Sequence, residues 1–209
     1  MGVPFKQNDL ILFQGDSVTD CGRNREDPNG LGSGYPMLTS AWLAASYSEQ
    51  QLRLVNRGIS GNRTCDLLTR WEQDCIALQP AWVSILIGIN NTWRRYDSND
   101  PTPVERFEQE YRRLLEWTKR ETSAKIVLCE PFVLPYPEDR ITWREDLDPK
   151  LAVVRKLADE FADVLVPLDV IFEQAATRQA PQYWAADGVH PTLAGHALIA
   201  QSWVKHVCG

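Results

Sequence analysis

The 209-residue sequence predicts an α/β fold, a three-layer α/β/α sandwich with a five-stranded parallel sheet in the middle. Three observations favour this class. Five short runs rich in Val, Ile and Leu alternate with longer amphipathic stretches, the runs are almost uninterrupted in apolar character, and they stop at Gly, Pro or Asp. Such runs are typical of strands covered on both faces, as in a parallel sheet. Parallel strands in this order need right-handed helical crossovers.

Each strand-like run has strand length and its own end signal. The first run stops at Gly15, the second near Gly58, the third at Gly88, the fourth before Pro131 and the fifth at Asp169. Glycine, proline and aspartate mark the turns that follow strands. The five predicted strands cover residues 10–14, 52–56, 82–87, 125–129 and 164–168.

The stretches between the runs have helical spacing. Proline at a first helical turn supports two of the predicted starts, at Pro149 and Pro191. The predicted helices cover residues 34–46, 64–78, 103–121, 148–161 and 191–207. No linker or repeat interrupts the pattern, so we expect one domain over residues 1–209. The polar, proline-containing segments 96–103 and 135–148 could line a substrate cleft or form plain surface loops.

Composition excludes several classes of function. The chain carries 28 acidic and 22 basic residues, a net charge of −6, which gives no electrostatic footprint for nucleic acid or an anionic membrane surface. The longest apolar run, residues 83–89, is far too short to span a bilayer. Five cysteines without a Cys-x-x-Cys pair argue against a disulfide framework or a zinc cage. With no signal peptide visible, we expect a reduced, cytoplasmic protein.

A serine near the start of the chain is a candidate nucleophile. Ser17 follows Gly15 at the end of the first predicted strand, and a glycine there permits a tight turn that presents the hydroxyl at the sheet edge. A serine attacks only if a base takes its proton, and the base needs an orienting group. Only three histidines are available. His206 and His196 lie in the last predicted helix, where we expect structural roles.

His190 has the better context for a base. It precedes a predicted helix, in a glycine-containing loop that lets Asp187 fold back toward the imidazole. A carboxylate on Nδ1 would fix the tautomer and leave Nε2 facing Ser17. An Asp-x-x-His pair can also bind a metal, but no further His or Cys lies nearby to complete such a site.

Acyl transfer also needs hydrogen-bond donors for the developing oxyanion. Ser17 offers its backbone N–H at a strand-to-helix turn, Gly58 offers an N–H that no Cβ blocks, and Asn90 offers a side-chain amide. Gly58 could equally be a turn glycine, and Asn90 a turn or cap residue. All three positions follow strands, and in an open parallel sheet the carboxyl ends of the strands gather at one edge.

Together these segments resemble the four sequence blocks of the SGNH (GDSL-type) hydrolases, in the family's order. The resemblance covers about residues 9–203. Four blocks in order are a specific signal, whereas any one alone would be weak. The blocks are Gly15-Asp-Ser-x-Thr-Asp20, Gly58 within Asn-Arg-Gly-Ile-Ser-Gly, Gly88-x-Asn90, and Asp187-x-x-His190-Pro191.

The resemblance implies a flavodoxin-like sandwich that carries a serine esterase site and needs neither a metal nor another cofactor. By this resemblance Ser17 is the nucleophile and one oxyanion donor, and Gly58 and Asn90 are the other two donors. His190 is the general base, and Asp187 orients it.

Within the family the chain is similar to intracellular bacterial acetylxylan esterases. This likeness implies removal of acetyl groups from short xylo-oligosaccharides by a homo-oligomer. One position departs from the family, whose third block is usually Gly-x-Asn-Asp, because Asn91 replaces the aspartate. The amide donor Asn90 is kept, so the departure bears on the positioning and pH behaviour of the oxyanion hole rather than on the reaction class.

Eight tryptophans favour a sugar-binding interpretation, because aromatic rings offer flat apolar platforms. Trp93 lies just past Asn90 and Trp184 just before Asp187, so both are expected near the site, with packing as the alternative. The other six tryptophans are expected in the core or at an interface. The predicted substrate-binding residues are Asp16, Asn91, Trp93, Arg94, Tyr96 and Trp184.

Two alternatives to a sugar deacetylase stay open at this point. One is a general short-chain carboxylesterase, lysophospholipase or thioesterase of the same family. The other is a non-catalytic relative that binds carbohydrate in the same cleft. In each case we expect a small-molecule ligand, no nucleic acid and no membrane.

Overall fold

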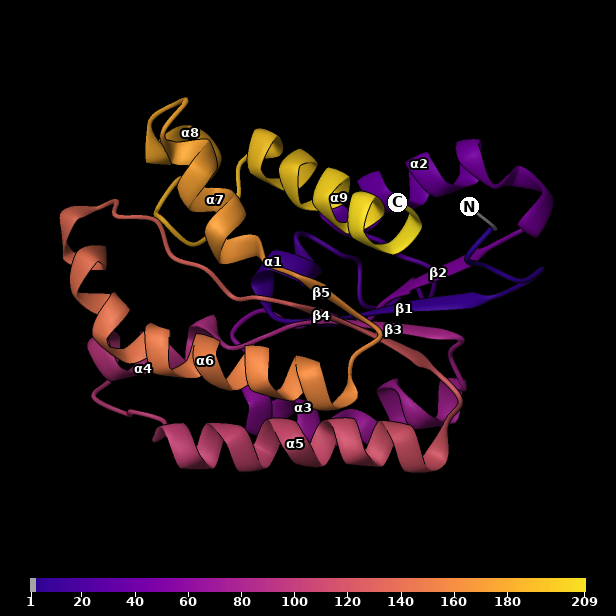
Figure 1. The fold of residues 1–209 in the computed structure, drawn as a ribbon, viewed down its shortest axis with the longest axis horizontal. Helices are drawn as coiled ribbons and strands as arrows, with labels where there is room; N and C mark the ends of the chain where they lie inside the picture. The colour runs from indigo at the N-terminus through magenta and orange to yellow at the C-terminus, as the bar shows by residue number, and fades with distance from the viewer. Residues whose placement is uncertain (1–2) are drawn as a thin grey trace.

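The computed structural model describes residues 3–209 and confirms the predicted α/β class (Figure 1). Its five strands are all parallel and lie in the order β2-β1-β3-β4-β5. Helices cover both faces of this sheet, which gives the three layers. The strands are β1 (Leu10–Gly15), β2 (Arg53–Asn56), β3 (Trp82–Leu86), β4 (Lys125–Cys129) and β5 (Val164–Val166).

The helices divide between the two faces of the sheet. In the view of Figure 1, α2, α7, α8 and α9 lie above the sheet, and α3, α4, α5 and α6 lie below it. The α-helices are α1 (Ser17–Asp20), α2 (Tyr35–Ser46), α3 (Thr64–Asp74), α4 (Ile89–Asp97), α5 (Val104–Glu121), α6 (Arg144–Phe161), α7 (Leu168–Ala176), α8 (Pro181–Trp184) and α9 (Leu193–Cys208). Three short 3-10 helices are η1 (Ser48–Gln50), η2 (Ile76–Leu78) and η3 (Glu138–Trp143).

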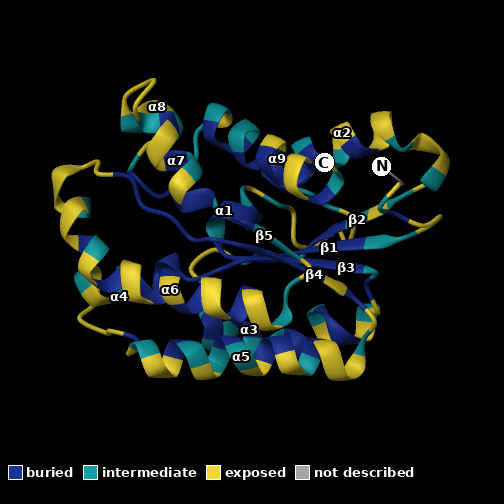
Figure 2. Cartoon of the chain, in the orientation of Figure 1, coloured by how far each residue is buried: buried dark blue, intermediate teal, exposed yellow. Residues whose placement is uncertain are grey.

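The apolar runs are uninterrupted because the strands bury both faces (Figure 2). In β1, Ile11 and Phe13 pack into one core together with Trp203 of α9, while Leu12 packs into the opposite core with Trp71 of α3. All five of these side chains are inaccessible to solvent. Burial of large side chains on both faces stabilises the sandwich by about 1.5–3 kcal/mol for each one.

The structure differs from the sequence-based expectation mainly in its short helices. Helices α1, α4, α7 and α8 were not expected, and most of the polar segment 135–148 is helical rather than a loop. Helix α6 begins at Arg144, so Pro149 lies inside it rather than at its start. Glu145 and Asp146 occupy its first turn, where acidic side chains interact favourably with the helix dipole. In the sequence these two residues are a less conspicuous start signal than the proline.

Three loops meet at the carboxyl edge of the sheet. Strand β1 runs directly into α1, and β3 leads through Gly88 into α4. The chain after β2 stays paired with β1 for a few residues, since Arg57 N–H donates to Phe13 O and Ile59 N–H donates to Gly15 O. The following residues then form the loop into α3. No helix within residues 3–209 has the length and apolar character needed to cross a membrane.

Candidate active site

Ser17 is held at the first position of α1 by tight packing of the preceding turn. A Cβ on Gly15 would lie 2.3 Å from both Leu86 O and Thr19 Oγ1, so only glycine allows the strand and the helix to close on each other here. Asp16 caps the helix by accepting the Val18 N–H at 3.0 Å. The half-buried Ser17 hydroxyl therefore projects from the sheet edge, as the sequence predicts.

The structure brings His190 and Asp187 to this serine across the sheet edge. Ser17 Oγ lies 2.9 Å from His190 Nε2, and His190 Nδ1 lies 2.7 Å from Asp187 Oδ2. The other carboxylate oxygen of Asp187 accepts the backbone N–H groups of Val189 and His190, at 3.0 and 2.7 Å. A carboxylate can only accept, so Nδ1 carries the proton and Nε2 presents its lone pair to the serine hydroxyl.

Glycine is required in the loop that makes this geometry. Gly188 has a φ of +83°, and a Cβ there would lie 2.1 Å from Tyr136 O. Its carbonyl accepts the Leu134 N–H at 2.8 Å, which ties the Asp187–His190 loop to the chain after β4.

Asp187 and His190 perturb one another's pKa values. Partial burial opposes ionisation of Asp187, but hydrogen bonds from the His190 ring and from two backbone N–H groups outweigh it and lower the pKa of the carboxyl well below its usual range. The hydrogen bond to Asp187 raises the pKa of His190 despite partial burial. The pair therefore favours the ionic state once the imidazole takes up a proton.

The other two histidines have structural contacts, as expected. His196 is 5% exposed and accepts the Tyr35 N–H on Nδ1, which leaves Nε2 beside Cys21 Sγ at 3.2 Å. Burial lowers the pKa of His196 to about 4, so it stays neutral. His206 hydrogen-bonds through Nδ1 to Ser202 O within α9.

The structure corrects the expectation that Gly58 is an oxyanion donor. Its N–H already donates to Asn56 Oδ1 at 2.8 Å, in a buried position. A Cβ on Gly58 would lie 2.4 Å from Asp20 N and 2.9 Å from Thr19 Cβ, so the glycine serves to let α1 approach the chain after β2. The strand-like pairing continues past β2, and the exposed loop begins only after residue 59.

A second glycine, Gly61, which the sequence reasoning missed, is better placed to donate to an oxyanion. Gly61 is exposed, has a φ of +84° and faces open space, and within residues 3–209 its N–H has no hydrogen-bond acceptor. The next residue, Asn62, accepts the side-chain N–H of Asn90 on its carbonyl at 3.1 Å. The Gly61 loop and Asn90 thus lie together. The signal in the sequence was a second glycine followed by polar residues, beyond the segment that pairs with β1.

Asn90 is presented by the first turn of α4 with its amide orientation fixed. Nδ2 donates to the Asn62 carbonyl, which can only accept, and Oδ1 faces Arg94 Nη2 at 3.4 Å, which can only donate. One N–H of the Asn90 amide is left for another acceptor. Ser17 N–H, at the start of α1, has no acceptor within the described residues.

Trp93 lies beside His190, as the sequence predicts. Its ring centroid is 5.5 Å from that of His190 and 5.2 Å from that of the buried Trp143. Arg140, which the sequence reasoning missed, places its guanidinium 5.1 Å from the centroid of the Trp93 ring and 4.0 Å from that of Trp143. Its Nε also donates to Asp187 O at 3.3 Å. Nothing in the local sequence distinguished this arginine from a surface residue.

Two of the predicted substrate-binding residues are buried. Asp16 is 2% exposed and caps α1, and burial raises its pKa to about 7. Asn91 is fully buried. Neither side chain is therefore available for contact with a sugar.

The remaining predicted substrate-binding residues make internal contacts. Arg94 contacts Asn90 and pairs with Asp97 rather than projecting freely. Tyr96 donates its hydroxyl to a backbone carbonyl at 2.9 Å, and the indole N–H of Trp184 donates to another at 3.0 Å. These contacts leave Trp93 as the predicted residue best placed for a ligand.

Within residues 3–209 there is no cluster of three or more His, Cys, Asp or Glu side chains that could bind a metal ion. At the carboxyl edge of the parallel sheet, hydrogen bonds link a serine to an imidazole and the imidazole to a carboxylate. This arrangement is typical of hydrolases that form acyl-enzymes. Residues 13–198 match the GDSL-like Lipase/Acylhydrolase family, and the chain belongs to this family. It is a carboxylic ester hydrolase.

Two relatives and a solved structure agree with this assignment. The chain is 38% identical to an acetylxylan esterase from Geobacillus stearothermophilus over 205 residues, which cover 94% of this chain and 93% of that protein. It is 27% identical to thioesterase 1/protease 1/lysophospholipase L1 of Escherichia coli K12, over 95% and 83% of the two chains. The crystal structure of Axe2, an acetylxylan esterase from G. stearothermophilus, superposes with a TM-score of 0.87, 36% identity and coverage of 98% and 96%.

Proposed function

We propose that this enzyme removes acetyl groups from small acetylated carbohydrates, with acetylated xylo-oligosaccharides as substrates. The observation that carries the proposal is the continuous chain from Ser17 Oγ through His190 to Asp187, with links of 2.9 and 2.7 Å. Similarity to an acetylxylan esterase supports the acetyl specificity. Two structures of Axe2 are of catalytic mutants, in which an Asp and a His with two residues between them are replaced, the same spacing as Asp187 and His190 here.

In the first half-reaction His190 Nε2 takes the hydroxyl proton as Ser17 Oγ attacks the acetyl carbonyl carbon. The C–Oγ bond forms and the carbonyl electrons move onto oxygen. When the tetrahedral intermediate collapses, the bond to the sugar oxygen breaks, and the imidazolium returns its proton to that oxygen. Asp187 stabilises the imidazolium between these steps, which agrees with the raised pKa of His190.

In the second half-reaction water replaces the sugar. His190 takes a proton from water as its oxygen attacks the acetyl-Ser17 carbonyl, and then protonates Ser17 Oγ as that bond breaks. Acetate leaves, and the serine hydroxyl is restored. The base and the acid are the same imidazole in both halves.

Three donors would stabilise the oxyanion in both halves. They are Ser17 N–H, Gly61 N–H and the free N–H of the Asn90 amide. The first two lack acceptors within the described residues, and the third is oriented by its neighbours. Preorganised donors of this kind stabilise the transition state by several kcal/mol, because they need no rearrangement when charge develops.

Trp93 would provide a platform for a sugar ring beside the base. Its ring is held by Trp143 and by Arg140, so little conformational freedom is lost on binding.

The test compares three esters with wild-type enzyme and Ser17→Ala. We expect fast hydrolysis of an aryl acetate and of peracetylated xylose, slow hydrolysis of an aryl octanoate, and no activity in the variant. Equal or faster octanoate turnover would overturn the sugar proposal. It would favour a general short-chain esterase or thioesterase, for which the similarity to the E. coli thioesterase is the supporting observation. Assembly as a homo-oligomer and a cytoplasmic location stay predictions.

A further inference from the structure

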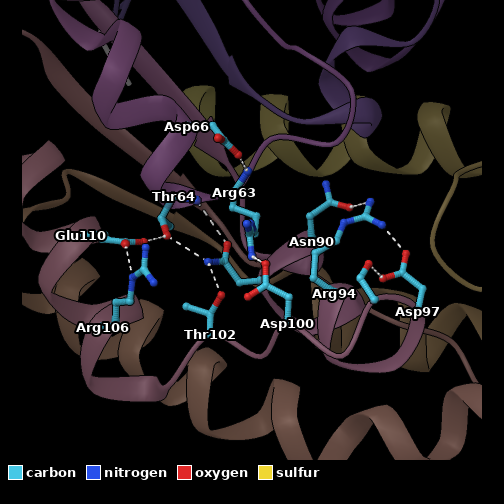
Figure 3. Close-up of polar contacts among 12 residues, drawn as sticks. Arg63, Thr64, Asp66, Asn90, Arg94, Asp97, Asp100, Thr102, Arg106 and Glu110 are labelled. Carbon is cyan, nitrogen blue, oxygen red and sulfur yellow. Dashed lines mark hydrogen bonds and ion pairs between the residues drawn. The ribbon is translucent and has the colours of Figure 1, made fainter.

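Behind the amide of Asn90 lies a buried polar network that the reaction itself does not use. Asn91 is fully buried and contacts the first residue of α3, Thr64, through both ends of its amide. Thr64 N–H donates to Asn91 Oδ1 at 3.2 Å, and Asn91 Nδ2 donates to Thr64 Oγ1 at 3.0 Å and to Thr102 Oγ1 at 3.4 Å. On the far side, Thr64 Oγ1 lies 2.6 Å from Glu110 Oε2 of α5 (Figure 3).

Glu110 sets the direction of the hydrogen bonds that the Thr64 hydroxyl makes. Its other oxygen, Oε1, accepts from Arg106 Nε at 2.7 Å, so the carboxylate accepts from both neighbours. The single hydroxyl proton of Thr64 must then point to Glu110, and Thr64 Oγ1 can only accept from Asn91. Residue 91 therefore has to supply an N–H toward Thr64, which an amide can do and a carboxylate cannot.

The network joins the two loops that carry oxyanion donors. Thr64 follows Gly61 by three positions, and Asn91 is adjacent to Asn90 in α4. The two loops also meet where Asn90 Nδ2 donates to Asn62 O. Two connections thus hold the loops together, one at the donors and one beneath them in the protein interior.

We propose that Glu110, acting through Thr64 and Asn91, is a positioning residue that fixes the Asn90 amide relative to the Gly61 loop. The proposal rests on the proposed function, because it needs these groups to be oxyanion donors. Asn91 and Glu110 form a matched pair, in which the acceptor at position 110 dictates a donor at position 91. Both side chains act through Thr64 rather than by touching the substrate.

The donor and the acceptor of the matched pair can be exchanged between positions 91 and 110. In Asn91→Asp, the carboxylate still accepts Thr64 N–H, but its second oxygen faces Thr64 Oγ1 with no proton between them, and it adds a second negative charge to the network. In the double variant Asn91→Asp/Glu110→Gln, the introduced glutamine keeps its carbonyl oxygen on Arg106 and donates its amide to Thr64 Oγ1. The Thr64 hydroxyl then turns to the introduced aspartate, and every group is again paired.

The experiment measures kcat and KM for an aryl acetate, together with thermal unfolding. We expect Asn91→Asp to lower kcat by roughly 10- to 100-fold with KM changed less than about twofold, the effect of an unpaired buried group on an oxyanion donor. Adding Glu110→Gln should recover at least about tenfold of that loss. The matched control adds Glu108→Gln, on the same helix but paired with Arg112 and Lys156, and should recover nothing.

Three results would overturn the proposal: an Asn91→Asp variant with wild-type kcat, a double variant no better than the single one, or equal recovery by Glu108→Gln. If Asn91→Asp fails to fold, Thr64→Val against Thr64→Ser provides the same test, because only serine keeps the hydroxyl. We then expect a kcat loss in the valine variant alone, and equal kcat values would overturn the proposal. Inactive wild-type enzyme would instead refute the proposed function.

Discussion

Replacing Asp187 by asparagine should disable the proposed base, His190, by reversing its tautomer. Asp187 Oδ1 accepts two backbone N–H groups at 2.7 and 3.0 Å, so the amide oxygen of the variant takes that position. The amide N–H₂ then faces His190 Nδ1, which in the wild type lies 2.7 Å from Asp187 Oδ2. Two donors cannot share that contact, so Nδ1 becomes the acceptor and the proton moves to Nε2, which can no longer accept from Ser17.

The expected loss in kcat is roughly 10²- to 10⁴-fold, or about 3–5 kcal/mol of transition-state stabilisation. The lower half of this range is favoured because the pair is partly exposed, at 44% for the His190 and 36% for the Asp187 side chain, and water can compensate in part. The carboxylate also raises the pKa of His190 above its usual value near 6.5. The base must be neutral, so wild-type kcat/KM should fall as the pH drops through that raised pKa.

The assay is kcat/KM for an aryl acetate between about pH 5 and 9, with Asp159→Asn, an exposed position on α6, as the control. In Asp187→Asn the acid limb of the remaining activity should shift to a lower pH than in wild type. The pKa of His190 falls because the stabilising negative charge is gone. A variant within about threefold of wild-type kcat would refute the tautomer argument, and an unmoved acid limb would contradict the effect of Asp187 on the pKa of His190.

Three further substitutions test separate parts of the site. Trp93→Ala should raise KM for acetylated xylose about tenfold and leave KM for an aryl acetate unchanged. The control Trp42→Ala, at an exposed position, should change neither KM. Equal effects of Trp93→Ala on both esters would contradict the role of Trp93 as a sugar platform. Arg94→Met should lower kcat about tenfold for both esters, because Arg94 orients the Asn90 amide, whereas Arg95→Met should not. An effect on KM for the sugar ester alone would instead indicate that Arg94 binds the sugar. Gly58→Ala should lower the free energy of unfolding in urea by roughly 1–3 kcal/mol, and unchanged stability would contradict the close packing against α1.

The sequence was sufficient for the sheet and for bringing the serine, histidine and aspartate together, because those features depend on local signals. Apolar runs that end in glycine mark the strands, and Asp187 and His190 lie within one short loop whose glycine allows the fold-back. Parallel topology then brings Ser17 to the same edge. None of these steps requires knowledge of side-chain packing.

The remaining site residues depend on packing that one sequence does not reveal. Gly58 and Gly61 lie three positions apart and look alike in the sequence, but only the hydrogen bond from the Gly58 N–H to Asn56 Oδ1 shows which N–H is already used. Trp184 is as near in sequence to Asp187 as Trp93 is to Asn90, yet its indole N–H donates to a backbone carbonyl. Arg140 reaches the site because η3 packs against α4 through aromatic contacts.

The replacement of the usual aspartate by Asn91 shows the same limit. In the sequence it marks a departure from the third block with consequences only for the oxyanion hole. In the structure its amide matches a distant acceptor on α5, Glu110, through the Thr64 hydroxyl. A contact of that kind cannot be anticipated from spacing.

The proposed mechanism depends on Ser17 carrying the acetyl group between the two half-reactions. The most direct measurement is mass spectrometry of peptides from enzyme mixed with an aryl acetate and quenched in acid within milliseconds. We predict the mass of one added acetyl group on the peptide that contains Ser17, present in wild type and absent in Ser17→Ala. Full turnover with no acetylated peptide, or acetyl on another residue, would contradict the mechanism.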